Sequence, residues 1–104
     1  MPNRNYIKGR RAEYETIKIL EAEGYTCSRS AASKGRVDIY AFLTDQKEEC
    51  QPVVRAISVK ATKYITQKDK EELETLRLPS FVSCEIWQFL PYRPPKIIEI
   101  LRPL

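Results

Sequence analysis

The segment SAASKGRVDIYAFLTDQKEECQPVVRAISVK, residues 30–60, decides how the rest of this chain is arranged. Two runs in it, RVDIY at 36–40 and RAISVK at 55–60, are rich in β-branched and aromatic residues and predict neighbouring strands. Asp38 lies at the start of the first run, and Lys60 ends the second. If the runs pair as a hairpin, this carboxylate and this ammonium lie at the same end of the sheet. Such a pair is suited to metal-assisted phosphate chemistry.

The distribution of charge is uneven along the chain. Its 104 residues fit one domain, so we expect a single domain over residues 1–104. The formal net charge of +4 comes from residues 1–36, which hold eight lysines and arginines against four acids, whereas the remainder holds ten of each. An excess of positive charge in one segment indicates a polyanion-binding surface. The alternative is an ordinary solvated surface.

Several classes of protein are excluded by composition. No run of 18 apolar residues is present, and the first residues lack the apolar stretch of a signal peptide, so we expect a cytoplasmic protein that does not contact membranes. Three cysteines without histidine argue against a structural zinc site, and we expect reduced thiols in small apolar spaces. The glycine-rich signatures of nucleotide sites are absent, so no small-molecule cofactor is predicted.

Periodicity predicts an α/β fold with a mixed sheet of about five strands flanked by helices, in the order α-β-β-β-α-β-β. An irregular basic lead-in over residues 3–9 precedes a helix from about Arg10 to Ala22, which ends at Gly24. A second helix is expected to follow Thr66 as its N-cap. The predicted strands cover 25–30, 37–43, 53–62, 82–90 and 97–101, and the second helix covers 68–77.

The first helix places an acid on its apolar face. At 100° per residue, Glu13 shares a face with Thr16 and Leu20. A buried acid is costly unless it is hydrogen-bonded, paired or bound to a metal. The alternative, in which Glu13 reaches water past the first turn, is equally compatible with the pattern. The aromatic residues Trp87, Phe89 and Tyr92 could line a dimer surface or fill the core, and the core is the expectation.

Four sequence motifs follow one another along the chain: KGRRAE at 8–13, LEAEGY at 20–25 with RSAASK at 29–34, GRVDI at 35–39, and ISVKAT at 57–62. Over residues 5–100 they resemble the archaeal-type Holliday junction resolvases, a branch of the PD-(D/E)XK nuclease superfamily. The resemblance implies a restriction-endonuclease-like core. It also implies a homodimer that cuts four-way DNA junctions by phosphodiester hydrolysis with Mg²⁺ or Mn²⁺.

The resemblance also implies roles for individual residues. Glu13 and Asp38 would hold the metal, with the Val59 backbone carbonyl as a further ligand. Lys60 would activate the attacking water or stabilise the phosphate, and Ser33 would lie near the scissile phosphate. The residues implied in binding DNA are Arg4, Lys8, Arg10, Arg11, Arg29, Ser30, Lys34, Arg36 and Lys63.

One position departs from the family pattern. The family has Glu-x-Lys where this chain has Ser58-Val59-Lys60, so a direct metal ligand is replaced by a hydroxyl that could bind only weakly. A substitute acid could come from Glu71, Glu72 or Glu85. The alternative function is a nuclease fold that binds branched DNA without cutting it. A third reading is a small α/β domain that binds a protein, for which salt-dependent DNA affinity is not expected.

Overall fold

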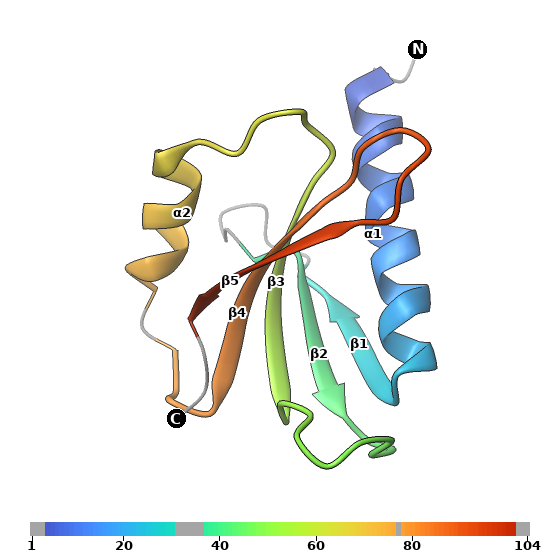
Figure 1. Ribbon diagram of the computed structural model, residues 1–104, viewed down its shortest axis with the longest axis vertical. Helices are drawn as coiled ribbons and strands as arrows, with labels where there is room; N and C mark the ends of the chain where they lie inside the picture. Colours follow the sequence, from blue (N-terminus) through green and yellow to red (C-terminus); the bar gives the residue numbers. More distant parts are fainter. Residues whose placement is uncertain (1–3, 31–36, 77, 102–104) are drawn as a thin grey trace.

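The computed structural model describes residues 4–30, 37–76 and 78–101, with side chains from residue 9 onward (Figure 1). The elements follow the predicted order, so the predicted α/β fold class is confirmed. They are α1 (Arg4–Ala22), β1 (Tyr25–Arg29), β2 (Ile39–Leu43), β3 (Val54–Lys60), α2 (Gln67–Glu74), β4 (Val82–Gln88) and β5 (Lys96–Leu101).

The five strands form one mixed sheet in the order β1-β2-β3-β4-β5. β3 and β4 are parallel, and every other neighbouring pair is antiparallel. Parallel strands need a crossover connection, which α2 supplies. β2 and β3 pair as the predicted hairpin with Ile39 opposite Ile57, so Asp38 and Lys60 lie at the same end of the sheet.

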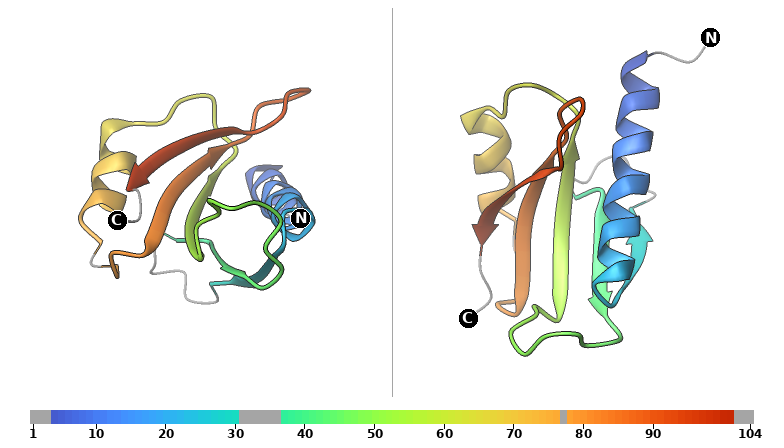
Figure 2. Two further views of the ribbon diagram at one scale, coloured as in Figure 1. Left: turned by 60° about the horizontal axis from the view of Figure 1, so that its bottom comes forward. Right: turned by 45° about the vertical axis from the view of Figure 1, so that its right-hand side comes forward.

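The two helices lie on opposite faces of this sheet (Figures 1 and 2). The core on the α1 face is formed by Leu20, Tyr25, Ile39, Ala41, Ile57 and Trp87. The core on the α2 face is formed by Val37, Ala56, Leu73, Val82, Cys84 and Ile86. β3 alternates between the two faces of the sheet, because Ala56 and Ile57 belong to different cores. Val37 lies on the α2 side, contrary to strict alternation, because β2 begins only at Ile39.

The first helix begins earlier than the sequence suggested. The prediction of an irregular lead-in over residues 3–9 was wrong, because α1 starts at Arg4 and runs for 19 residues. Gly9 lowers helix propensity by about 1 kcal/mol relative to alanine. Once the helix is nucleated, however, each further residue adds a hydrogen bond without a new nucleation cost.

Helix boundaries elsewhere follow their capping residues. Gly24 has φ +100°, and its carbonyl accepts hydrogen bonds from the N–H groups of Thr44 and Asp45, as expected for the glycine that ends a helix. Thr66 is the N-cap of α2 and forms a capping box with Asp69, which confirms the predicted cap. The helix ends at Glu74, earlier than predicted.

Two further predictions concern the cysteines and the helices. All three cysteines are free thiols, but only Cys84 is buried, whereas Cys27 is half-buried and Cys50 is exposed in a loop. The expectation that all three fill apolar spaces was therefore wrong for Cys50. Within the described residues, neither helix is long and apolar enough to cross a bilayer.

Candidate functional site

Asp38 is held by backbone groups at the end of the sheet. Its Oδ2 accepts a hydrogen bond from the Val59 N–H at 2.7 Å, and its own N–H donates to the Ile57 carbonyl at 2.9 Å. Its carbonyl accepts from the Ser30 N–H at 2.9 Å. The N–H and C=O of one strand residue point to the same neighbour, so the Val59 carbonyl faces the same side as Asp38. The carboxylate is thus fixed beside the last residue pair of β2 and β3.

Two charges from distant parts of the chain act on Asp38. Burial raises the pKa of this carboxyl, and the negative charge of Glu13 raises it further. The Val59 N–H and the positive charge of Lys60 oppose that rise in pKa without cancelling it. The pKa of Asp38 therefore responds to opposite charges, from the acid of α1 and from the lysine of β3. A partly buried carboxylate beside a second carboxylate is stabilised by a bound cation.

Glu13 is partly buried and ion-paired. Its side chain is 22% exposed, and its Oε2 lies 2.7 Å from Nη2 of Arg29 on β1. The Tyr14 ring lies beside this pair, with the guanidinium carbons of Arg10 and Arg29 each 5.8 Å from its centroid. Arg10 donates to the Tyr14 hydroxyl at 3.4 Å, which lowers the pKa of that phenol. Glu13 is accordingly an ion-paired acid that is partly exposed, so it is neither fully buried nor simply turned to water, the two alternatives that the sequence left open.

Lys60 extends towards α2. Its Nζ lies 3.8 Å from Oδ1 of Asp69, and its side chain is 35% exposed. The other oxygen of Asp69 accepts from the Thr66 N–H at 3.0 Å. This backbone hydrogen bond is the first cause that lowers the pKa of Asp69, and Lys60 adds to it. Sequence reasoning missed Asp69, although the Thr-x-x-Asp spacing of a capping box marks it.

Ser58, at the position where the resemblance implies an acid, is buried, with 2% exposure. Among the substitute acids considered, Glu71 is exposed on α2 and Glu72 is half-buried there. Among the described residues, the acid of α2 that pairs with Lys60 is Asp69.

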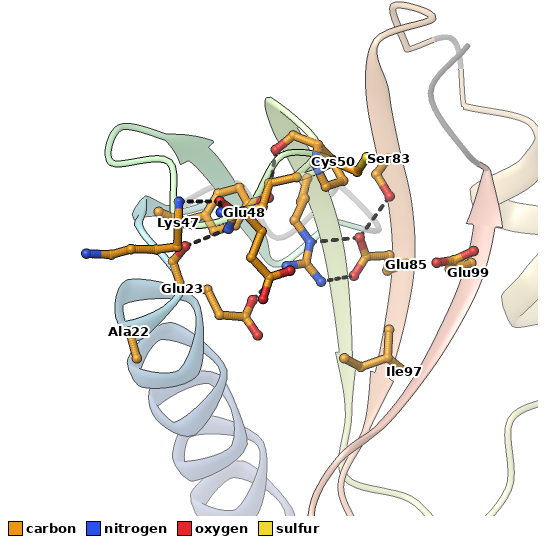
Figure 3. A pocket seen from close by; sticks show the side chains of 13 residues that line it. Ala22, Glu23, Lys47, Glu48, Cys50, Ser83, Glu85, Ile97 and Glu99 are labelled. Carbon is orange, nitrogen blue, oxygen red and sulfur yellow. Dashed lines mark hydrogen bonds and ion pairs between the residues drawn. The ribbon is translucent and has the colours of Figure 1, made fainter.

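Glu85 belongs to a different cluster (Figure 3). Its carboxylate accepts two hydrogen bonds from Arg55, at 2.6 and 2.8 Å, one from Ser83 at 2.8 Å and one from the Trp87 indole at 2.9 Å. This network lines a cavity of about 810 Å³ beside the loop between β2 and β3, at the sheet end remote from Lys60. Glu85 is therefore the counter-ion of Arg55, and it does not lie with Asp38.

The predicted DNA-binding residues are described only in part. Ser33, Lys34 and Arg36 lie outside the described residues, and Arg4 and Lys8 are placed on α1 by their backbone alone. Ser30 is half-buried. Exposed side chains belong to Arg10, Arg11, Arg29 and Lys63. Lys63 lies 5.7 Å from the centroid of the Tyr64 ring, which is 75% exposed.

Few oxygen atoms of the described residues near Asp38 are candidates for binding a divalent metal ion. No three acidic, histidine or cysteine side chains gather as a metal site within the described residues. The raised pKa of Asp38 and the nearby charge of Glu13 are the electrostatic conditions that a cation relieves. Mg²⁺ commonly takes one or two protein carboxylates and keeps several waters. Asp38, Glu13 and the Val59 carbonyl are oxygen donors of the kind and number that such an ion takes.

The sheet carries an acid beside β2 and a lysine at the end of β3, and its fold was compared with known proteins. A solved structure of Hjc from Archaeoglobus fulgidus, described as a Holliday junction resolvase from an archaeal hyperthermophile, is similar with a TM-score of 0.65. The identity is 22%, over 89% of this chain and 73% of that chain. No family model matches this chain, and no curated protein matches it in sequence. The likeness shows the fold, which is an Hjc-like nuclease fold.

Proposed function

We propose that this protein is a structure-selective endonuclease that cuts four-way DNA junctions by metal-dependent phosphodiester hydrolysis. The observation that carries the proposal is the position of Asp38 on this fold, under the charges of both Glu13 and Lys60. Two copies related by a two-fold axis, the commonest homo-oligomer, would present two sites to opposing strands.

Each site residue has a chemical task in this proposal. Asp38 and Glu13 would hold Mg²⁺ or Mn²⁺, with the Val59 carbonyl and, weakly, the Ser58 hydroxyl as further oxygen donors. The bound ion would supply Lewis-acid stabilisation of the phosphate. The Lys60 ammonium stabilises the negative charge that grows on the phosphate during hydrolysis and orients the attacking water.

Lys60 is in turn positioned by Asp69, which supplies a carboxylate from α2. The capping hydrogen bond from Thr66 fixes this carboxylate, so α2 holds the lysine from the face opposite to α1. Ser33 stays a proposed contact of the scissile phosphate.

Recognition would depend on the shape and charge of the DNA backbone. Arg10 and Arg29 present guanidinium groups around Tyr14 next to Glu13. The excess charge of residues 1–36 and the exposed Arg11 and Lys63 extend this basic surface, with Arg4, Lys8, Ser30, Lys34 and Arg36 as further proposed contacts.

A cleavage assay tests the proposal. A labelled four-way junction and a linear duplex of the same sequence are incubated with the protein and Mg²⁺ or Mn²⁺. We expect paired nicks in the junction only, and a loss of rate on the order of a hundredfold or more in Asp38→Ala, as for removal of one transition-state contact. Asp45→Ala, in an acid that is 70% exposed on a loop, is the matched control and keeps the wild-type rate. Absence of nicking with either metal overturns cutting.

A second candidate function, junction binding without cutting, is favoured by the buried Ser58 in place of an acid. It predicts tight junction binding in EDTA, no nicking, and no effect of Lys60→Ala. Ser58→Glu separates the two functions: a large gain in cleavage shows a site that lacks one ligand. Continued absence of cleavage in that variant favours a protein that only binds.

A further inference from the structure

A groove adjoins the candidate site on its α1 side. It lies between α1 and the hairpin that joins β4 to β5, which approaches α1 in Figures 1 and 2, and its volume is about 550 Å³. Ala12, which precedes Glu13, and Ala61, which follows Lys60, both line it. The groove therefore begins one residue away from two members of the candidate site.

The lining of this groove suits a flat ring with polar edges. Phe89, Leu90 and the two alanines provide apolar surface, and one cation, Arg11, and one acid, Glu15, lie among them. Within the described residues Arg11 makes no ion pair, so its guanidinium is available to a phosphate. The volume falls within the range of about 300–1,000 Å³ that is typical of ligand pockets.

Tyr92 closes one end of the groove at the tip of the hairpin. Its side chain is fully exposed (106%), so the expectation that it lies in the core was wrong, whereas Trp87 is buried as expected. It has φ +60°, a left-handed conformation that is costly for a residue with a bulky side chain. Pro91, Pro94 and Pro95 surround it and restrict the hairpin backbone. The Tyr92 ring is thus exposed to water on a stiff and strained turn, so its exposure does not stabilise the fold.

We infer that this groove binds an unstacked nucleobase of the DNA substrate, with the Tyr92 ring stacked on the base and Arg11 on the adjoining phosphate. The inference rests on the proposed function, because it names the part of a branched substrate that lies next to the site. Bases at a branch point are more easily displaced from the helix than bases inside a duplex. Stacking on an aromatic side chain tolerates any base and needs no sequence.

Charge favours DNA over a protein partner as the occupant. Arg11 lies in the groove with one acid, Glu15, and Arg93, next to Tyr92, is exposed on the same hairpin, so the cations around the groove outnumber its acid. Arg10 precedes Arg11 on α1, and its side chain is exposed as well. A phosphate backbone that reaches the candidate site would therefore pass along cations on its way to the groove.

The test measures binding in EDTA, so that no cutting occurs, to a four-way junction, to a linear duplex and to a junction with abasic sites at the branch point. Tyr92→Asn and Tyr92→Gly remove the ring and keep a residue that tolerates positive φ. Both are expected to weaken junction binding roughly tenfold, the effect of one lost stack, and to spare duplex binding. Tyr92→Phe, the matched control, keeps the ring and the wild-type affinity.

The abasic junction makes the test specific. Wild-type protein should bind it about as weakly as Tyr92→Asn binds the intact junction, and the variant should show no further loss, because the two partners of one contact are coupled. The slope of affinity against salt should stay unchanged in Tyr92→Asn and fall by about one in Arg11→Gln.

Three results overturn the inference while wild-type protein still binds junctions. They are wild-type affinity in both Tyr92→Asn and Tyr92→Gly, equal losses on junction and duplex, and an abasic penalty that is the same with and without the ring. A change of oligomeric state in Tyr92→Asn with unchanged junction affinity also overturns it, because the groove would then contact protein. A wild-type protein that binds no junction overturns the proposed function as well.

Discussion

Glu85→Gln tests whether Glu85 supports the fold or the chemistry. In the structure its carboxylate neutralises Arg55 in a buried network, with Glu85 3% and the Arg55 side chain 11% exposed. The substitution keeps the size of the side chain and one carbonyl oxygen, and it removes the charge and the bidentate pairing with Arg55. We therefore expect a loss of stability with metal affinity unchanged.

The magnitude follows from burial. Removing one partner of a buried ion pair costs about 3–5 kcal/mol, because the other charge is left uncompensated. Arg55 keeps one other acid, Glu23 at 3.0 Å, which is 46% exposed. We expect the lower end, about 3 kcal/mol. With an unfolding entropy of about 2.1 cal/mol/K per residue over this chain, the Tm falls by roughly 14 °C.

Thermal unfolding followed by circular dichroism measures this change. Glu48→Gln is the matched control, because Glu48 lines the same cavity but is exposed, and its Tm should stay within a few degrees of wild type. Metal binding measured by calorimetry should be alike in wild type and Glu85→Gln. A Tm change of less than about 2 °C, or a loss of metal affinity with the Tm unchanged, would contradict the assignment of Glu85 to the fold.

The same pair has a pH signature. Burial by itself raises the pKa of Glu85, but hydrogen bonds from Arg55, Trp87 and Ser83 outweigh it, and the pKa lies below its ordinary value. A group whose pKa is lowered by folding contributes stability above its unfolded pKa, about 4.3 for glutamate, and loses it as the pH falls. The difference in Tm between wild type and Glu85→Gln should therefore shrink in acid.

Two further predictions concern stability at single positions. Asp38→Asn should abolish cutting and, measured in EDTA at neutral pH, should raise the Tm, because burial and Glu13 raise the pKa of the Asp38 carboxyl and disfavour its ionised form in the fold. The gain in Tm should vanish below about pH 4, where the wild-type carboxyl is protonated in both the folded and the unfolded state. A lower Tm for the variant at pH 7 would refute this prediction. Gly24→Ala should lower the free energy of unfolding, measured with denaturant, by about 2 kcal/mol or more, because the residue has φ +100° and a Cβ would lie 1.8 Å from the Asp45 carbonyl oxygen. In the control Gly9→Ala, the added Cβ meets nothing within 4 Å in α1, and the free energy of unfolding should rise by about 1 kcal/mol.

Prediction from the sequence succeeded where one local pattern decides the outcome. The two apolar runs pair as the predicted hairpin, and Thr66 caps α2 as its hydroxyl predicts. It failed at the start of α1, because the propensity of residues 4–9 is weak and extension of an existing helix decides their conformation.

The candidate site was predictable only in outline. Asp38 and Lys60 were expected at one end of a hairpin, and they lie there. The pairing of Glu13 with Arg29 and the approach of Asp69 to Lys60 involve contacts between elements that no periodicity links. Glu85 looked equally able to replace the missing acid, because a sequence does not show which charges meet in the core.

The sequence by itself determined the kind and order of the elements and the placement of Asp38 and Lys60 at one end of the sheet, because these depend on short-range periodicity and on a single hairpin register. Only the tertiary structure decided which charges neighbour them and what surrounds them. The packing of α1 and α2 on opposite faces of the sheet sets the pairs of Glu13 and Lys60, and the path of the β4–β5 hairpin leaves Tyr92 in water. Such distances arise from the packing of segments far apart in the chain, which local residue patterns do not encode.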